Sequence, residues 1–155
     1  MKMNGYVLPL LLASTVAFFT GCGGESSTYV VVGTLTVSSR VQGVTYHPPQ
    51  PGNYRFTITG GAYSFGSGGW STALVIYRDR PVQTDSSHGR PNPTNPDASV
   101  GDFELQASRE LAEQIGLNKE TTVGISGYAI FIVPDDFGTF NDNTGSINLL
   151  VEREE

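Results

Sequence analysis

One segment of the chain, Tyr54 to Thr59, alternates apolar and polar residues without a break. Successive side chains of a β-strand point to opposite faces, so this period of two is typical of a strand with one buried face. Other short runs rich in β-branched or aromatic residues are separated by turn-forming residues. They are residues 29–37, 41–46, 73–77, 121–125, 128–133 and 147–151. The pattern predicts an all-β fold, a jelly-roll-like β-sandwich.

Two segments depart from this strand pattern. Residues 105–117 contain the one helix that the sequence predicts, with Ser108 as its N-cap and Gly116 at its end. Its apolar stripe consists of Leu111, Ala112 and Ile115. Residues 78–102 hold four prolines among polar residues, which predicts a long surface loop.

The N-terminus has the composition of an export signal. Met1 and Lys2 precede an apolar stretch from Tyr6 to Phe19, and Thr20 and Gly21 follow it. A basic start, an apolar centre and small residues before a cleavage point are typical of a secretory signal peptide. The stretch is too short for a convincing transmembrane helix. The sequence therefore predicts an exported protein.

Cys22, which directly follows Thr20 and Gly21, is the only cysteine of the chain. The segment resembles the lipobox of bacterial lipoproteins, although Phe19 stands where that motif usually has leucine. The resemblance implies cleavage before Cys22, lipidation of Cys22 and a lipid-anchored position in the bacterial cell envelope. It divides the chain into a signal peptide (1–21), a tether (22–28) and one domain (29–155). The alternative is an ordinary signal peptide followed by an unrelated cysteine.

The charge of the chain limits the classes of partner. Without residues 1–21 the chain loses Lys2, which leaves 8 basic and 15 acidic residues, a balance of −7. Nucleic-acid binding, which calls for a basic patch, is not expected. Electrostatic attraction to anionic lipid is not expected either, so the acyl chains on Cys22 would provide the membrane contact. No Gly-x-Ser-x-Gly motif or spaced histidine pair indicates an enzyme.

Residues 134–146 form a segment rich in oxygen ligands. They include three aspartates, two asparagines, two threonines and two glycines, with no lysine or arginine. Calcium takes six to eight oxygen ligands from carboxylates, amides, carbonyls and water, so this composition favours a Ca²⁺ site. Asp, Asn and Gly are also the common residues of tight turns, which is the alternative explanation.

The same segment resembles the C-terminal loop of the calcium-dependent galactose-binding lectins of the PA-I type. Asp135, Gly138-Thr139-Phe140, Asp142-Asn143 and Thr144-Gly145-Ser146 match that loop without a gap. Residues 52–66 resemble the family's strand and loop that end in Ser-Tyr-Gly, with Phe65 in place of the tyrosine. These lectins are small jelly-roll sandwiches in which one calcium ion bridges protein and sugar.

The resemblance implies a specific set of ligands. Ca²⁺ would take a carboxylate oxygen of Asp135, backbone carbonyls of Phe65 and Thr139, and side-chain oxygens of Asp142 and Asn143. The sugar would be contacted by Asp135, Asp136, Asn143 and His88. His88 lies in Ser87-His88-Gly89-Arg90-Pro91, which departs from the family's His-Pro-x-Gln.

The sequence thus predicts an exported, lipid-anchored, calcium-binding module that binds carbohydrate. The alternative is a structural or protein-interaction module of the cell envelope, in which calcium only stabilises a loop.

Overall fold

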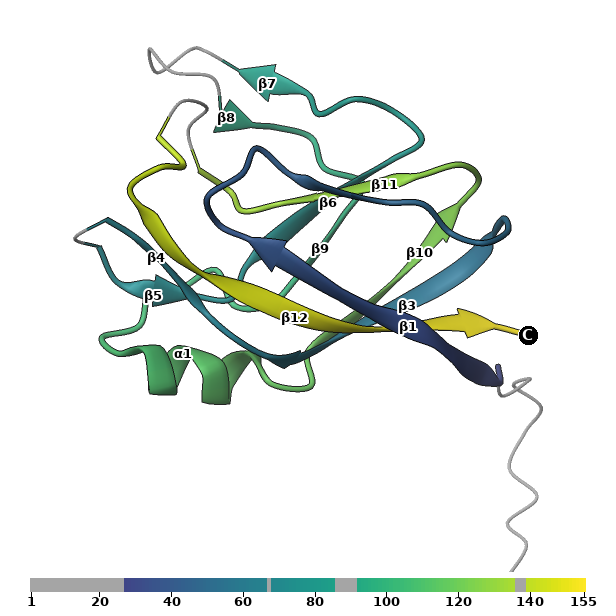
Figure 1. Ribbon diagram of the computed structural model, residues 1–155, viewed down its shortest axis with the longest axis horizontal. Coiled ribbons are helices and arrows are strands. Elements are labelled where there is room, and N and C mark those ends of the chain that lie inside the picture. The colour runs from purple at the N-terminus through teal and green to yellow at the C-terminus, as the bar shows by residue number, and fades with distance from the viewer. Residues whose placement is uncertain (1–26, 67, 86–91, 136–138) are drawn as a thin grey trace, which may run out of the picture.

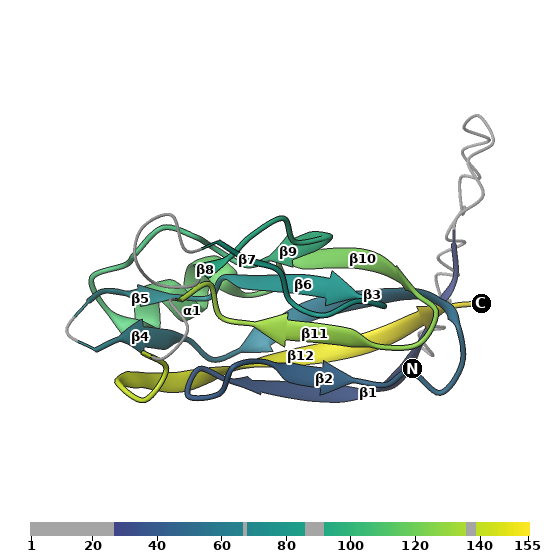
Figure 2. The same ribbon diagram turned by 90° about the horizontal axis from the view of Figure 1, so that it is seen from above.

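The fold consists of two antiparallel β-sheets that face each other (Figures 1 and 2). It is seen in a computed structural model that describes residues 27–66, 68–85, 92–135 and 139–155. The larger sheet contains β1 (Tyr29–Ser38), β3 (Gly52–Gly60), β4 (Tyr63–Phe65), β5 (Trp70–Ser71), β10 (Glu120–Ile125) and β12 (Asn143–Glu154). The smaller sheet contains β2 (Val44–Tyr46), β6 (Leu74–Arg78), β9 (Ala98–Val100) and β11 (Ala129–Ile132).

A two-stranded ribbon and one helix lie outside these sheets. β7 (Thr84–Asp85) pairs with β8 (Asn92–Pro93), and α1 (Arg109–Gly116) packs beside β5. No helix in the described ranges is long and apolar enough to cross a membrane. The prediction of an all-β, jelly-roll-like sandwich with one short helix is confirmed for the described residues, because the chain passes repeatedly from one sheet to the other.

The twelve-residue strand β12 is the centre of the larger sheet. On one side it pairs with β1, from Tyr29 opposite Glu154 to Ser38 opposite Ser146. On its other side it pairs with β3 and, at its start, with β4. Its start therefore lies at one end of the sandwich, and its C-terminal end lies beside the start of β1 at the other end (Figure 1).

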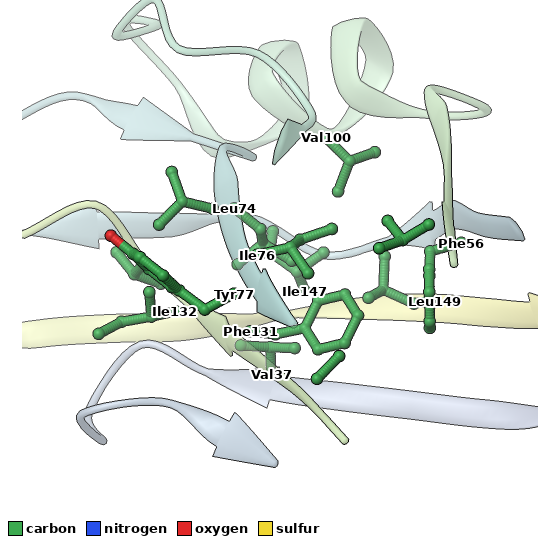
Figure 3. Close-up of a cluster of buried hydrophobic side chains, with 14 of the residues drawn as sticks. Val37, Phe56, Leu74, Ile76, Tyr77, Val100, Phe131, Ile132, Ile147 and Leu149 are labelled. Carbon is green, nitrogen blue, oxygen red and sulfur yellow. The ribbon is translucent and has the colours of Figure 1, made fainter. Parts of the chain in front are cut away.

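The core fills the space between the sheets. The inward residues of β3, which are Tyr54, Phe56 and Ile58, are fully buried, as their alternation predicts. The ring of Phe56 meets that of Phe131 from the opposite sheet, with 4.7 Å between centroids, and Figure 3 shows both within the buried cluster. Burying one such large side chain stabilises the fold by roughly 1.5–3 kcal/mol.

Two glycines allow β4 to continue along β12. Gly61 (φ 88°) precedes β4, and Gly145 (φ 102°) lies in β12. A Cβ on Gly61 would overlap the carbonyl oxygen of Ser146, and one on Gly145 would overlap that of Ala62. The two backbones therefore approach each other so closely that only glycine fits, and both positive φ values also favour glycine.

The structure corrects three details of the sequence analysis. Residues 78–102 are not a plain loop, because β9 pairs with β6 and extends the smaller sheet. The polar residues 143–146 belong to β12 rather than to a loop, since 143–145 pair with β4. The last strand is therefore four residues longer at its start than its apolar run indicates.

The third correction concerns α1. Its N-cap is Ser108 as predicted, with Leu111 N donating to Ser108 Oγ at 3.2 Å. Its buried residues are Ala112 and Gly116, whereas Leu111 and Ile115 are 41% and 36% exposed. Gly116 is the last helical residue and packs against the side chain of Thr72, where a Cβ would overlap. The helix therefore packs through its small residues, and of the predicted stripe only Ala112 is buried.

Candidate cation site at the start of β12

Three segments meet where β12 begins: the turn after β1, the residues that follow β11, and strand β4. Ser39 N and Ser39 Oγ both donate to the carbonyl oxygen of Gly145, at 3.2 and 2.9 Å. Asp135 lies three residues after β11, and its N–H donates to Val133 O at 2.8 Å. Phe65 of β4 pairs with Asn143 in the sheet. Asn143 is the residue that all three segments approach.

The side chain of Asn143 is fully buried and its amide orientation is fixed. Nδ2 donates to the carbonyl of Ser39 at 3.1 Å and to Oδ2 of Asp135 at 2.8 Å. An exchange of the amide nitrogen and oxygen would place an oxygen against two acceptors, so the hydrogen-bond network excludes the alternative orientation.

This orientation leaves the amide oxygen of Asn143 without a partner. Among the described residues, no donor reaches the buried Oδ1. A buried acceptor without a hydrogen bond costs roughly 1–3 kcal/mol, and such groups in native proteins usually have a specific reason. A cation bound at Oδ1 would satisfy it, so the donor set fits a cation.

Asp135 brings a carboxylate to the buried side of this site, close to Tyr63. The Tyr63 hydroxyl donates to the carbonyl of Ala73 at 3.0 Å. Burial raises the pKa of Tyr63 well above its usual range, and the negative charge of Asp135 raises it further, while a hydrogen bond with Ser71 opposes the rise. Tyr63 is therefore a neutral hydroxyl at physiological pH, and the negative charge beside it belongs to Asp135.

The remaining candidate ligands lie around the same strand pair. The carbonyl of Phe65 accepts from Gly68 N at 2.7 Å, and the carbonyl of Thr139 accepts from Asp142 N at 3.2 Å. A carbonyl oxygen has two lone pairs, so each can accept this bond and still bind a cation. The Asp142 carboxylate lies beside Gly66, with Oδ2 3.5 Å from the position that a Cβ on Gly66 would take.

The structure thus gathers Phe65, Asp135, Thr139, Asp142 and Asn143 around the start of β12. Asp136, His88 and Cys22, which the sequence analysis also names, lie outside the described residues. Within the described ranges, no group of three or more His, Cys, Asp or Glu side chains could hold a metal ion. A cation here would therefore depend on amide and carbonyl oxygens as well as on carboxylates.

Sequence reasoning missed two residues of this site. Ser39 accepts the hydrogen bond that orients Asn143, and Arg40 donates from Nε to the backbone carbonyl of Asn143 at 2.9 Å. Both lie in the turn after β1, more than 100 residues away in sequence. No motif in the turn marks them, and only the pairing of β1 with β12 brings them to the site.

Comparison of the chain with protein-family models, characterised proteins and solved structures found no match.

Proposed function

We propose that this protein is an exported, lipid-anchored β-sandwich that binds Ca²⁺ at the start of β12 and holds a carbohydrate through that ion. The observation that carries the calcium proposal is the buried Oδ1 of Asn143, which has no hydrogen-bond donor among the described residues. Its orientation is set by Ser39 and Asp135, so the oxygen is held in place before any ion arrives.

The chemistry of the donors supports calcium over transition metals. The candidate ligands are two carboxylates, one amide oxygen and two backbone carbonyls, with no nitrogen or sulfur ligand. Hard oxygen sets of this kind suit Ca²⁺ and Mg²⁺, and the mixture of flexible carboxylate and carbonyl ligands favours Ca²⁺. When bound, the ion would supply a positive charge that sugar hydroxyls can coordinate.

The carbohydrate and the lipid anchor rest on the sequence. The match of residues 135–146 to the PA-I-type loop supports the sugar, and Thr20-Gly21-Cys22 supports the anchor. The arrangement of the domain is compatible with both. The start of β1, which follows the tether, lies at the end of the sandwich opposite the site (Figure 1), so a ligand could approach the site away from the membrane.

A second candidate function is a structural module of the cell envelope. Asn143 connects the turn after β1 and the residues after β11 to β12, so an ion at this place would hold three segments together without an outside ligand. The two functions differ in whether the calcium-bound protein binds a carbohydrate.

The test is a thermal melting series with calcium, magnesium and excess chelator. Residues 23–155 suffice, because the core lies wholly within residues 37–151. A ligand at a hundred times its Kd adds about 2.7 kcal/mol, which raises the Tm of a domain of this size by roughly 10 °C. We expect calcium to give such a shift in the wild type and Asn143→Ala to abolish it.

The matched control is Asn148→Ala, the same substitution further along β12. Asn148 Oδ1 accepts from Thr36 Oγ1 at an exposed position, so the calcium shift should persist. Asp142→Ala, at an exposed position, removes a candidate ligand oxygen and is a second site variant in case Asn143→Ala does not fold. A calcium shift that survives in both site variants would refute the site. A shift with no binding to a carbohydrate array would favour the structural module.

A further inference from the structure

Arg40 places a positive charge beside the candidate site. Its side chain is exposed, and Nε donates to the backbone carbonyl of Asn143 at 2.9 Å. Asn143 is also the residue whose amide oxygen is the candidate cation ligand. The guanidinium and the cation site are therefore neighbours, connected through one residue.

The guanidinium of Arg40 has no acidic partner within the described ranges. Four other basic residues do form ion pairs with carboxylates: Arg55, Arg80, Arg109 and Lys119. In Arg40, the Nε bond to Asn143 holds the side chain, and the two terminal nitrogens have no acceptor among the described residues. These two nitrogens lie in one plane and can donate side by side to the two oxygens of a carboxylate, so they match that group in shape and charge.

Among the described residues, Arg40 is an exposed cation without a carboxylate partner, beside an acidic segment. Asp142 precedes Asn143 in the sequence and Asp135 is hydrogen-bonded to it, in a chain of net charge −6, whereas Arg40 contacts the backbone carbonyl of Asn143. A protein with this net charge repels anions in general. Arg40 is therefore the group that would allow an anionic ligand to approach this particular site.

We propose that the ligand of the site is an acidic sugar of the uronic acid class. Its carboxylate would bind the terminal nitrogens of Arg40, and its hydroxyls would face the cation at Asn143. This inference rests on the proposed function, because it assigns the chemical class of the carbohydrate at the same site. Arg40 is then a specificity-determining residue rather than only a link between the turn after β1 and strand β12.

The experiment compares galacturonic acid with galactose, which differ only in whether C6 is a carboxylate or a hydroxymethyl group. Titration calorimetry would use residues 23–155 with free calcium held in large excess, since uronates themselves bind calcium weakly. A charge-assisted bidentate contact is worth about tenfold or more in Kd. We expect the wild type to bind galacturonic acid at least tenfold more tightly than galactose.

Variants of Arg40 separate recognition from structure. Arg40→Gln should remove the preference for galacturonic acid, so that the two sugars bind this variant within about twofold of each other. Arg40→Lys, which keeps the charge but loses the planar fork, should retain part of the preference. The matched control is Arg78→Gln, because Arg78 also donates to a backbone carbonyl, that of Gly124, and has no ion pair with another described residue. It should leave the preference unchanged.

The calcium-dependent Tm shift is an independent readout. Removing a neighbouring positive charge lessens the repulsion of Ca²⁺, so Arg40→Gln should keep the calcium shift or enlarge it. A smaller shift in Arg40→Gln would show that Arg40 serves only to hold the site together, and would overturn the inference.

Other outcomes separate the inference from the proposed function. Equal affinity for the two sugars, or a preference that persists in Arg40→Gln, overturns the acidic ligand while calcium-dependent sugar binding stands. Failure of galacturonic acid to bind the wild type also overturns it, and the calcium melting series then decides whether the proposed function falls as well. Binding of galacturonic acid that persists in chelator overturns the inference, because the ion is then not involved.

Discussion

Replacing Gly145 by alanine should destabilise the protein strongly, because two backbones meet at this position. Gly145 has φ 102°, and a Cβ there would overlap the carbonyl oxygen of Ala62 and lie 3.0 Å from Cα of Tyr63. The disfavoured backbone conformation costs about 1–3 kcal/mol. Overpacking against a rigid backbone costs about 1–3 kcal/mol more. We expect a total of about 4 kcal/mol, a large part of the 5–15 kcal/mol that typically stabilises a domain.

The assay is urea unfolding in chelator, followed by the fluorescence of Trp70, the only tryptophan of the chain. Chelator removes any contribution of an ion to the comparison. The expected loss of about 4 kcal/mol corresponds to a fall in Tm of roughly 15 °C for a domain of this size. The matched control is Gly52→Ala, since a Cβ on Gly52 would make only ordinary contacts at 3.8 Å. The control should stay within about 1 kcal/mol of the wild type.

Unfolding of Gly145→Ala and Gly52→Ala at the same urea concentration would refute this prediction. That result would mean that β12 and β4 do not approach each other as closely as the structure describes. The geometry of the candidate site would then be in error too, since Asn143 and Phe65 belong to the same strand pair.

Two further predictions concern hydrogen bonds outside the cation ligands. Tyr63→Phe removes the donor to the buried carbonyl of Ala73 and should cost about 1–3 kcal/mol in urea unfolding, whereas an unchanged midpoint would contradict this bond. The carboxylate of Asp79 accepts the backbone N–H groups of residues 126–128, and these bonds hold the pKa of Asp79 below its usual range. Because the pKa is lowered on folding, the stabilisation is present above about pH 4 and is lost as pH falls through the folded pKa. Asp79→Asn keeps a side chain that tolerates φ 54° and should lower the Tm at pH 7. The difference from the wild type should begin to shrink near pH 4 and vanish only below the lowered folded pKa, and a difference that stays constant with pH would refute this.

The sequence predicts strands in which apolar and polar side chains alternate, but not strands that are held mainly by backbone pairing with a neighbouring strand. Tyr54, Phe56 and Ile58 are buried as their spacing indicates, because a half-buried strand must place apolar residues on one face. Residues 143–146 are polar and contain a glycine, which is typical of a turn. They form a strand because β4 lies alongside and supplies backbone partners, a fact that no local pattern contains.

The helix shows a different limit of sequence reasoning. Its position and its Ser108 cap follow from the sequence, but of its predicted apolar stripe only Ala112 is buried. Gly116 lies so close to Thr72 that a Cβ would not fit, and Ala112 is buried, whereas Leu111 and Ile115 are partly exposed. Hydrophobic periodicity predicts the face with the larger residues and does not take the distance to the neighbouring strand into account.

For the candidate site, the sequence indicates residues that lie in recognisable motifs, which include Phe65 of the distant strand β4, but not Ser39 and Arg40. Asp135 and Asn143 belong to one segment, and the structure joins them by a hydrogen bond of 2.8 Å. Ser39 and Arg40 reach the same place through the register of β1 with β12, which depends on the whole sheet. A turn with a single arginine contains no signal for such a role.

The pairing of β1 with β12 also determines how the domain would respond to mechanical force. Tyr29 and Asn143 begin these two antiparallel strands at opposite ends of the sandwich. A ligand pulled away from Asn143 against an anchor before Tyr29 would slide the strands along each other, so their hydrogen bonds would bear the load together. Force applied between Tyr29 and Glu155 would instead peel the strands apart one pair at a time. In a single-molecule pulling experiment, we therefore expect the first attachment to withstand the higher force.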